Sequence, residues 1–401
     1  MLAEITAEGD RVPIKAWLPV EEIEPGALEQ LHNAASHPFV GPHLAVMPDC
    51  HQGVGVTIGS VLPTVREVIP NAVGVDIGCG MCAIDTGVRF NPKKMDRNFW
   101  RTWAGRVQRD VPTGFSVHKQ PQRLGHLDRE LRAKKLQSLL KSKAIFQLGT
   151  LGGGNHFMEA QVDERNQIWL MVHSGSRHTG LRIANHYDQW ARDLSGARGI
   201  NPPRDLASLP LDDEIGQDYL HDMTWATDFA LANRIAMLEA MLGALERSLD
   251  TLHEGIDNPH PPINIHHNFA ALETHGGEEL VIHRKGATSA QPDQIGIIPG
   301  SMGSASYIVR GLGNPDSFAS CSHGAGRTMS RSQARKTISD ADFAASLEGT
   351  FSKASASYID EAPGAYKEIT TVISRQRDLI DVLHTLKPII TLKGDSRAKE
   401  D

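Results

Sequence analysis

The sequence lacks the features that mark several broad classes of protein. None of its 401 residues falls in a run approaching the roughly 18 consecutive apolar residues of a membrane helix, so we expect no membrane partner. The first residues are acidic and contain no apolar stretch, so we expect no signal peptide. The 4 cysteines are too few and too scattered for a disulfide framework. These absences favour a globular protein of the cytoplasm.

Basic residues are not in excess either. The 41 Lys and Arg residues against 48 Asp and Glu residues give a formal net charge of −7. Nucleic acids usually meet a basic surface, so the total charge argues weakly against such a partner. Segment 101–143 differs, because it holds 11 basic residues and only 3 acidic ones. Such a run is either a solvated helix face or a strip that binds phosphate groups, and composition leaves both open.

Histidine and glycine are abundant instead, with 19 and 37 residues. Most glycines gather in loops with the sequences GVGVTIGSV, VGVDIGCGM, LGTLGGGNHF, HSGSRHTG, IPGSMGSASY and SHGAGR. A glycine loop lets the backbone approach a ligand closely, because no Cβ atom intervenes. Each of these loops begins or ends near a side chain that can bind metal or phosphate.

Hydrophobic patterning predicts an α+β fold. Apolar, β-branched runs predict buried strands at 72–77, 168–172 and 295–298, and helical spacing predicts helices at 124–143, 181–194 and 218–252. Strands and helices do not alternate regularly, which argues against a doubly wound sheet. We therefore predict one large domain over 1–394, with central mixed and antiparallel sheets. Helical excursions would span 96–145 and 181–260, and a polar tail would follow at 395–401.

Five residues of metal-binding type stand where predicted strands meet loops. They are Asp76, Cys79, His156, His173 and His267. One Cys, one Asp and three His can hold two adjacent ions if the thiolate bridges them. Cys79 and Cys82 could instead form a zinc knuckle or a redox pair, although the sequence has no second CxxC. Thiolate and imidazole donors by themselves would suit zinc or cobalt.

Two further loops have the composition of phosphate-binding sites. Segment 298–306 offers backbone amides and hydroxyl groups, and segment 321–327 places His323 before Gly324 and Gly326. Arg327 and Arg331 would lie one turn apart if a helix follows. Neither loop matches a P-loop or a Rossmann fingerprint. The residues alone therefore indicate a two-metal site that faces a nucleotide or phosphodiester, with a histidine available for covalent chemistry.

Long motifs across the chain resemble those of one known family. They are MPDCHQGVGVTIGSV, AVGVDIGCGM, LGTLGGGNHFMEA, VHSGSR, INIHHN, RKGA, IIPGSMGSASYIVRGLGN, SCSHGAGRTMSR, DEAPGAYK and a final LKG. In this order and spacing, from about residue 13 to residue 394, the sequence resembles the RtcB RNA-splicing ligases. The resemblance implies an RtcB-like fold with glycine-rich active-site loops.

The resemblance also implies roles for individual residues. Cys79 would bridge two Mn²⁺ ions, one of them also held by His156 and His173 and the other by Asp76 and His267. His323 would be the nucleophile that takes GMP from GTP, and Asp49 would support a later step of ligation. Residues expected to contact GTP are Asn155, Phe157, Glu159, Asn268, Ser301, Met302, Ser306, Gly324, Gly326, Tyr366 and Lys393.

Within that set, Glu159 and Ser306 would read the guanine edge, and Tyr366 would pack on its face. Residues expected to hold RNA phosphates are Arg177, Arg327 and Arg331. The implied reaction joins RNA ends with a 3′-phosphate or 2′,3′-cyclic phosphate to 5′-hydroxyl ends, as in RNA repair and tRNA splicing. An archease-like activator is a further candidate partner.

Two alternative functions and two departures from the family pattern accompany this interpretation. The alternatives are a dinuclear metal-dependent phosphoesterase and a non-catalytic RNA-binding module with a structural metal. After Arg177 the family usually has Gly-x-Gly, whereas this chain has His178, Thr179 and Gly180. The family typically ends at Lys-Gly, whereas 7 residues follow Gly394 here, so the tail must turn away if Lys393 is to reach a nucleotide.

Overall fold

Two β-sheets form the centre of the protein in a computed structural model that describes residues 1–256 and 259–394. The strand order of the first sheet is β1 (Ala3–Ile5), β2 (Ile14–Ala16), β3 (Leu44–His51), β4 (Ile58–Thr64), β12 (Glu278–Lys285) and β11 (Asn268–His275). The order of the second is β10 (Ile263–His266), β6 (Gly80–Arg89), β8 (Gln167–Ser174), β7 (Phe157–Val162), β17 (Ile380–Lys393), β15 (Ser306–Gly311) and β14 (Ile295–Ile298). Short ladders join β13 (Ala287–Ser289) to β16 (Ser320–Ser322) and β5 (Glu67–Val68) to β9 (Leu209–Pro210).

The pairing of these strands confirms the predicted α+β class with mixed and antiparallel sheets. Strands β2 and β3 run parallel, which makes the first sheet mixed. The neighbouring strands of the second sheet are all antiparallel.

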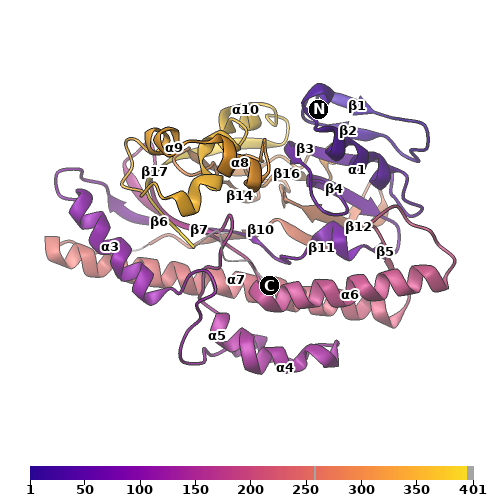
Figure 1. The fold of residues 1–401 in the computed structure, drawn as a ribbon, viewed down its shortest axis with the longest axis horizontal. Coiled ribbons are helices and arrows are strands. Elements are labelled where there is room, and N and C mark those ends of the chain that lie inside the picture. The colour runs from indigo at the N-terminus through magenta and orange to yellow at the C-terminus, as the bar shows by residue number, and fades with distance from the viewer. Residues whose placement is uncertain (257–258, 395–401) are drawn as a thin grey trace.

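Helices lie on both sides of the sheets (Figure 1). Their bounds are α1 Pro25–Ala35, α2 Pro70–Val73, α3 Arg97–Asp110, α4 Gln137–Leu139, α5 Ile145–Gln147, α6 Arg177–Ala197, α7 Glu214–Leu249, α8 Arg331–Thr337, α9 Asp340–Ser346 and α10 Ile369–Ser374. In Figure 1 the long helices α6 and α7 run along one side, and α8, α9 and α10 gather on the opposite side. Within the described ranges, no helix is both long and apolar enough to cross a bilayer.

Short turns of other helical types complete the inventory. The 3₁₀ turns are Val20–Glu22, Gly125–Leu127, Lys134–Leu136, Asp250–Leu252, Pro315–Ser317, Ala356–Glu361 and Pro363–Ala365, and Leu140–Ala144 is a π-turn.

The main core lies where α3 and α7 pack on the second sheet, with Trp100 and Trp103 fully buried against Met158, Leu170 and Met237. Burial of this apolar surface stabilises the packing of α7 on β6 and β8.

Most predicted elements are confirmed. Segments 168–172 and 295–298 lie in β8 and β14, and segment 181–194 lies in α6. Helix α7 covers the predicted 218–252 except its last residues. The predicted polar tail at 395–401 lies outside the described residues.

The predicted strand at 72–77 is wrong. Helix α2 occupies its first two residues, with Pro70 in the first helical turn, where a fixed φ favours helix initiation. Gly74 then ends the helix with a φ of 95°, a conformation that costs glycine little. The chain bends after Gly74, and the turn brings Asp76 close to Cys79, whose N–H donates to the carbonyl of Asp76 at 3.1 Å.

The predicted continuous helix at 124–143 is wrong over its first half. Residues 134–147 form one helical stretch in which 3₁₀, α and π turns follow one another, but residues 124–133 contain only the 3₁₀ turn Gly125–Leu127. The buried carboxylate of Asp222 in α7 accepts the backbone N–H groups of Arg132 and Ala133 at 2.8 and 2.9 Å. These amides therefore bond to a distant side chain instead of to helix carbonyls. Gly125, with a φ of 59°, interrupts the segment as well.

Candidate active site

A cavity of about 740 Å³ is lined by residues of both sheets. Predicted site residues that line it are Asp76, Cys79, Asn155, Phe157, Glu159, His173, His267, Asn268, Ser301, Met302, His323, Gly324, Gly326, Arg327, Arg331, Tyr366 and Lys393. These residues come from loops and strand ends spread over more than 300 positions of the chain. The fold thus brings together most of the residues that the motifs single out.

The predicted metal-binding residues stand at one end of neighbouring strands. Cys79 directly precedes β6, and His173 is close to the end of β8, which is antiparallel to β6 with Met81 opposite His173. His156 directly precedes β7, whose first residue, Phe157, also pairs with His173. His267 follows β10, and its N–H donates to the carbonyl of Cys79 at 2.8 Å. The antiparallel register therefore sets these side chains side by side.

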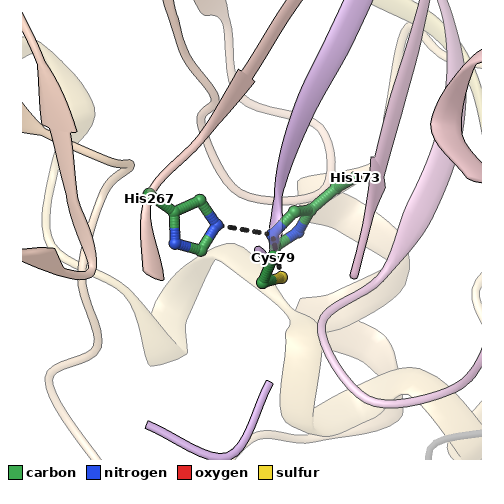
Figure 2. A group of neighbouring side chains, drawn as sticks. All are labelled: Cys79, His173 and His267. Atoms are coloured by element: carbon green, nitrogen blue, oxygen red, sulfur yellow. Dashed lines mark hydrogen bonds between the residues drawn. The ribbon is translucent and has the colours of Figure 1, made fainter. Parts of the chain in front are cut away.

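Their side chains form two clusters that share Cys79. In Figure 2, His173 and His267 point toward each other, with Nε2 atoms 3.1 Å apart, and Sγ of Cys79 lies 3.3 Å from Nε2 of His173. In the second cluster, Nε2 of His156 lies 3.4 Å from Sγ of Cys79 and 3.0 Å from Oδ2 of Asp76. One thiol between two donor groups is the arrangement that a bridging ligand requires.

Hydrogen bonds on the far side of each imidazole fix which nitrogen carries the proton. Nδ1 of His156 lies 3.1 Å from the carbonyl oxygen of Leu151, and Nδ1 of His173 lies 3.3 Å from that of Asn155. Because a carbonyl oxygen only accepts, each Nδ1 donates, and each Nε2 of a neutral ring keeps its lone pair. His267 contacts the amide oxygen of the next residue in the same way, at 3.3 Å.

This donor set fits divalent metal ions. Burial lowers the pKa of His173 and of His267 well below the ordinary value, so both rings are neutral at pH 7. Two lone pairs that face each other at 3.1 Å repel unless a cation lies beside them. The spacing groups Asp76 and His156 in one cluster, and His173 and His267 in the other. The family resemblance instead assigns His156 and His173 to one ion, so the division of ligands between the two ions stays a prediction.

His323 lies beside these clusters and is held by Asp49. Its Nδ1 donates to Oδ2 of Asp49 at 2.6 Å, and the same oxygen accepts the backbone N–H groups of His323 and Gly324 at 3.2 and 3.3 Å. Asp49 is fully buried in β3 and sits behind the imidazole ring. The ring of His323 lies 4.7 Å from that of His267, centroid to centroid. The carboxylate therefore orients the ring and leaves Nε2 as the available nitrogen.

Two glycine residues allow the backbone to lie close to Asp49 and to Asp76. Gly326 has a φ of 73°, and a Cβ atom there would overlap the carbonyl oxygen of Asp49. A Cβ atom at Gly175 would overlap the carboxylate of Asp76. The loops HSGSR and SHGAGR thus need glycine for steric reasons at these positions.

Glu159 lies in the same cavity as a buried acid. Burial raises its pKa to about 7, although hydrogen bonds from Thr391 and Gln161 act in the opposite direction. The hydroxyl of Thr391 donates to Oε1 at 2.6 Å, and the amide of Gln161 donates to Oε2. A carboxylate has about four lone-pair positions, so two remain for a ligand. Ser306 does not line the cavity but accepts a hydrogen bond from Gln161 at 3.0 Å.

Sequence reasoning missed Glu361, the centre of a charged cluster. Its buried carboxylate accepts hydrogen bonds from Lys393 at 3.0 Å and Tyr366 at 2.8 Å, and lies 3.4 and 3.5 Å from Arg327 and Arg331. Burial raises the pKa of Glu361, but these cations outweigh it and hold the pKa below the ordinary value. The motif DEAPGAYK contains Glu361, and its place among the motifs of the family resemblance was the available signal.

Arg327 covers part of the predicted guanine platform. Its guanidinium lies 4.8 Å from the centre of the Tyr366 ring and donates to the Tyr366 hydroxyl at 3.0 Å. Arg327 is not on a helix with Arg331, because α8 begins only at Arg331, after the capping residue Ser330. The two arginines meet through Glu361 instead of through helical spacing.

Two other cavity residues stand in quoted motifs but were assigned no role. Burial lowers the pKa of His51 to about 4, and its Nδ1 donates to the carbonyl of Asp49 at 3.0 Å. Burial lowers the pKa of Lys285 to about 8, and its Nζ donates to the carbonyls of Asn71, at 2.9 Å, and Val54. Their motifs, MPDCHQG and RKGA, were the signal that could have found them.

Some predicted RNA-binding residues lie away from the cavity. Arg177 is buried, and its guanidinium donates to the hydroxyl of Thr150 at 3.2 Å and to the carbonyl of Gly114 at 3.1 Å. The basic segment 101–143 is divided between α3 and the region of α4, which lie apart in Figure 1. None of the described side chains of this segment lines the cavity. Binding of RNA by these groups stays a prediction.

The cavity thus combines metal-binding donors, a histidine held by a carboxylate and a cluster of cations, which suits metal-dependent phosphoryl chemistry. Comparison with known proteins agrees with this class. The profile of the family described as "tRNA-splicing ligase RtcB" matches residues 30–140 and 122–394. This chain belongs to the RtcB family.

Similar proteins match over nearly their full length. The chain is 40% identical to the RNA-splicing ligase RtcB of Escherichia coli K12, over 96% of this chain and 98% of that protein. It is 31% identical to the RNA-splicing ligase RtcB of Mycobacterium tuberculosis H37Rv, covering 91% and 100%. It is 29% identical to the tRNA-splicing ligase RtcB of Nanoarchaeum equitans, covering 98% and 97%.

Proposed function

We propose that this protein is an RNA ligase that consumes GTP and joins RNA 3′-phosphate or 2′,3′-cyclic phosphate ends to 5′-hydroxyl ends. The observation that carries the proposal is the hydrogen bond of 2.6 Å from Nδ1 of His323 to Asp49, beside two donor clusters that share Cys79. It leaves Nε2 of His323 as the nucleophile in a cavity that also contains Glu159 and the Glu361 cluster. Membership of the RtcB family supports the assignment.

In the first step, Nε2 of His323 attacks the α-phosphorus of GTP. A P–N bond forms, the bond from the α-phosphorus to the bridging oxygen breaks, and pyrophosphate leaves. Positive charge develops on the imidazole as the new bond forms. The carboxylate of Asp49 stabilises that charge and keeps the proton on Nδ1. We therefore assign Asp49 a role in this first step as well as the later one implied by the family resemblance.

In the second step, an oxygen of the RNA 3′-phosphate attacks the phosphorus of the His323 adduct. The P–N bond breaks, His323 is restored, and the RNA end carries a pyrophosphate linkage to guanosine. The 5′-hydroxyl of the second RNA then attacks the phosphorus of the RNA 3′-phosphate and releases GMP. Its proton passes to solvent or to the departing phosphate. A 2′,3′-cyclic phosphate end must first be hydrolysed to the 3′-phosphate.

The donors Asp76, Cys79, His156, His173 and His267 would hold two metal ions. When bound, the ions supply Lewis-acid stabilisation of phosphate oxygens and orient the reacting groups. Manganese is proposed on the family resemblance alone, because thiolate and imidazole donors by themselves would favour zinc or cobalt.

The nucleotide would bind between the metal donors and the Glu361 cluster. Glu159 would accept hydrogen bonds from guanine N1–H and the 2-amino group, with Ser306 acting through Gln161. Tyr366 would pack on the base, which requires Arg327 to leave the ring and contact phosphate instead. The residues Asn155, Phe157, Asn268, Ser301, Met302, Gly324, Gly326 and Lys393 complete the proposed nucleotide site, and Arg177 and Arg331 the proposed RNA site.

The proposal also includes the location of the protein in the cell and a candidate activator protein. Cys50, Cys82 and Cys321 are buried thiols that form no disulfide, which supports a cytoplasmic location. An archease-like protein remains a candidate activator, and its effect on the number of turnovers per enzyme tests that role.

The experiment uses two RNA fragments, one with a labelled 3′-phosphate and one with a 5′-hydroxyl, together with purified protein and Mn²⁺. We expect a joined product only when GTP is present. A dinuclear phosphoesterase, the alternative function, would remove the phosphate without GTP and form no joined product. Phosphate release without joining, at equal rates with and without GTP, would refute the ligase proposal.

A further inference from the structure

The middle of helix α7 carries two neighbouring polar side chains that are fully buried, Asn233 and Arg234. Neither lines the cavity. Both contact loops that carry the metal-binding residues, and we take each in turn.

Arg234 joins strands β8 and β10 to the turn that precedes β6, behind one donor cluster. Its Nη1 donates to the carbonyl of Gly78 at 2.8 Å and to that of Ser174 at 2.9 Å. Its Nε donates to the side-chain oxygen of Asn264 in β10 at 2.8 Å. Gly78 precedes Cys79, Ser174 follows His173, and β10 leads into His267. One guanidinium therefore bonds to the segments next to Cys79, His173 and His267, the three residues shown in Figure 2.

Asn233 supports the second cluster in a similar way. Its Oδ1 accepts the N–H groups of Gly149 and Thr150 at 2.7 and 3.1 Å. Its Nδ2 donates to the carbonyl oxygens of Thr150 and Gly175 at 3.1 and 3.2 Å. The loop that follows Thr150 leads to His156, and Gly175 packs against the carboxylate of Asp76.

Burial of Arg234 destabilises the folded protein, and packing alone does not offset this effect. Its Nη2 is buried and has no acceptor among the described residues. Burial of an incompletely paired cation lowers the free energy of unfolding, and apolar residues of similar volume are often neutral or better at such positions. A role in holding β8, β10 and the turn before β6 at fixed spacing gives a reason for the arginine.

We infer that Asn233 and Arg234 are positioning residues that set the geometry of the metal donors through the loops behind them. The inference rests on the proposed metal site. Residues that orient metal ligands typically contribute about 10–100-fold to metal affinity. A lysine cannot replace Arg234, because its single ammonium cannot bond to all three acceptors in the planar geometry of the guanidinium.

The test is calorimetric titration of metal-free protein with Mn²⁺ alone. We expect Arg234→Lys to weaken binding by about 10–100-fold. The matched control is Trp225→Phe in the same helix, which loses packing and the hydrogen bond of 2.9 Å from the indole N–H to the carbonyl of Leu127, a residue outside the donor loops. Trp225→Phe should lower the Tm and leave Mn²⁺ affinity unchanged.

A second, milder variant keeps the test decisive if Arg234→Lys does not fold. Asn264→Ala removes the acceptor for Nε of Arg234 and the hydrogen bond of 3.0 Å from Nδ2 of Asn264 to the carbonyl of Leu231, but leaves Arg234 itself in place. It should weaken Mn²⁺ binding in the same direction by a smaller factor. With Co²⁺ in place of Mn²⁺, both variants should change the thiolate-to-cobalt absorption band, because the donor geometry changes.

The outcomes separate this inference from the proposed function. Wild-type affinity for Mn²⁺ in the folded variants, or an equal loss in Trp225→Phe, would overturn the positioning role and leave the ligase proposal intact. A wild-type protein that binds no divalent ion would overturn the proposed metal site and this inference together.

Discussion

Preference for GTP over ATP should depend on pH through Glu159. Burial raises the pKa of this carboxyl to about 7, and only the ionised form can accept both guanine N–H groups. Because the pKa is raised, the binding-competent form dominates above pH 7 and is lost as the pH falls. Apparent affinity scales with the competent fraction, so guanine recognition should weaken about 10-fold between pH 8 and pH 6.

The assay measures the dissociation constants of GTP and ATP with His323→Ala protein, which cannot consume the nucleotide by the proposed route. The ratio of the two constants cancels titration of the triphosphate and of the metal donors, since both nucleotides share them. Glu159→Gln is the matched variant: it should lose most of the preference for GTP, and its remaining ratio should not change with pH. A wild-type ratio that stays constant from pH 6 to pH 8 would refute the assignment of Glu159.

Three further changes test other parts of the site. Cys79→Ala should lose both metal ions whereas His173→Ala should mainly weaken one; metal analysis that finds two ions in Cys79→Ala would exclude a bridging thiolate. Asp49→Asn should slow transfer of GMP to the protein by about 100-fold or more in single-turnover assays, because the imidazolium loses its carboxylate; an unchanged rate would limit Asp49 to later steps. Arg331→Ala should reduce the slope of log RNA affinity against log salt by roughly 0.7, and charge reversal across 101–143 should reduce it further; unchanged slopes would mean that these cations do not contact RNA.

Local signals in the sequence predicted the elements that local interactions determine. The apolar run at 168–172 and the spacing of α7 required no knowledge of distant residues. The predicted helix at 124–143 fails over 124–133, where the carboxylate of Asp222, about 90 positions away, accepts the N–H groups of Arg132 and Ala133. The segment at 72–77 fails as a strand because Pro70 and Gly74 outweigh its β-branched residues.

The residues of the candidate site also fall into those that local motifs predicted and those that they did not. Asp76, Cys79 and His323 were found because reactive side chains interrupt glycine-rich motifs. Glu361 and Arg234 were not, since a glutamate in a turn and an arginine in a long helix are common on solvent-exposed surfaces. Only the folded chain reveals that both are buried, and that several groups from other segments converge on each.

The central claim is that His323 forms a covalent bond to GMP. The direct measurement is incubation of the metal-loaded protein with GTP labelled at the α-phosphate, followed by intact mass and peptide mapping of the adduct. We predict one GMP on His323, labile in acid and stable in alkali as a phosphoramidate is, and no adduct in His323→Ala although that variant keeps its metals. An adduct that persists in His323→Ala, or one that maps to a lysine, would contradict the account.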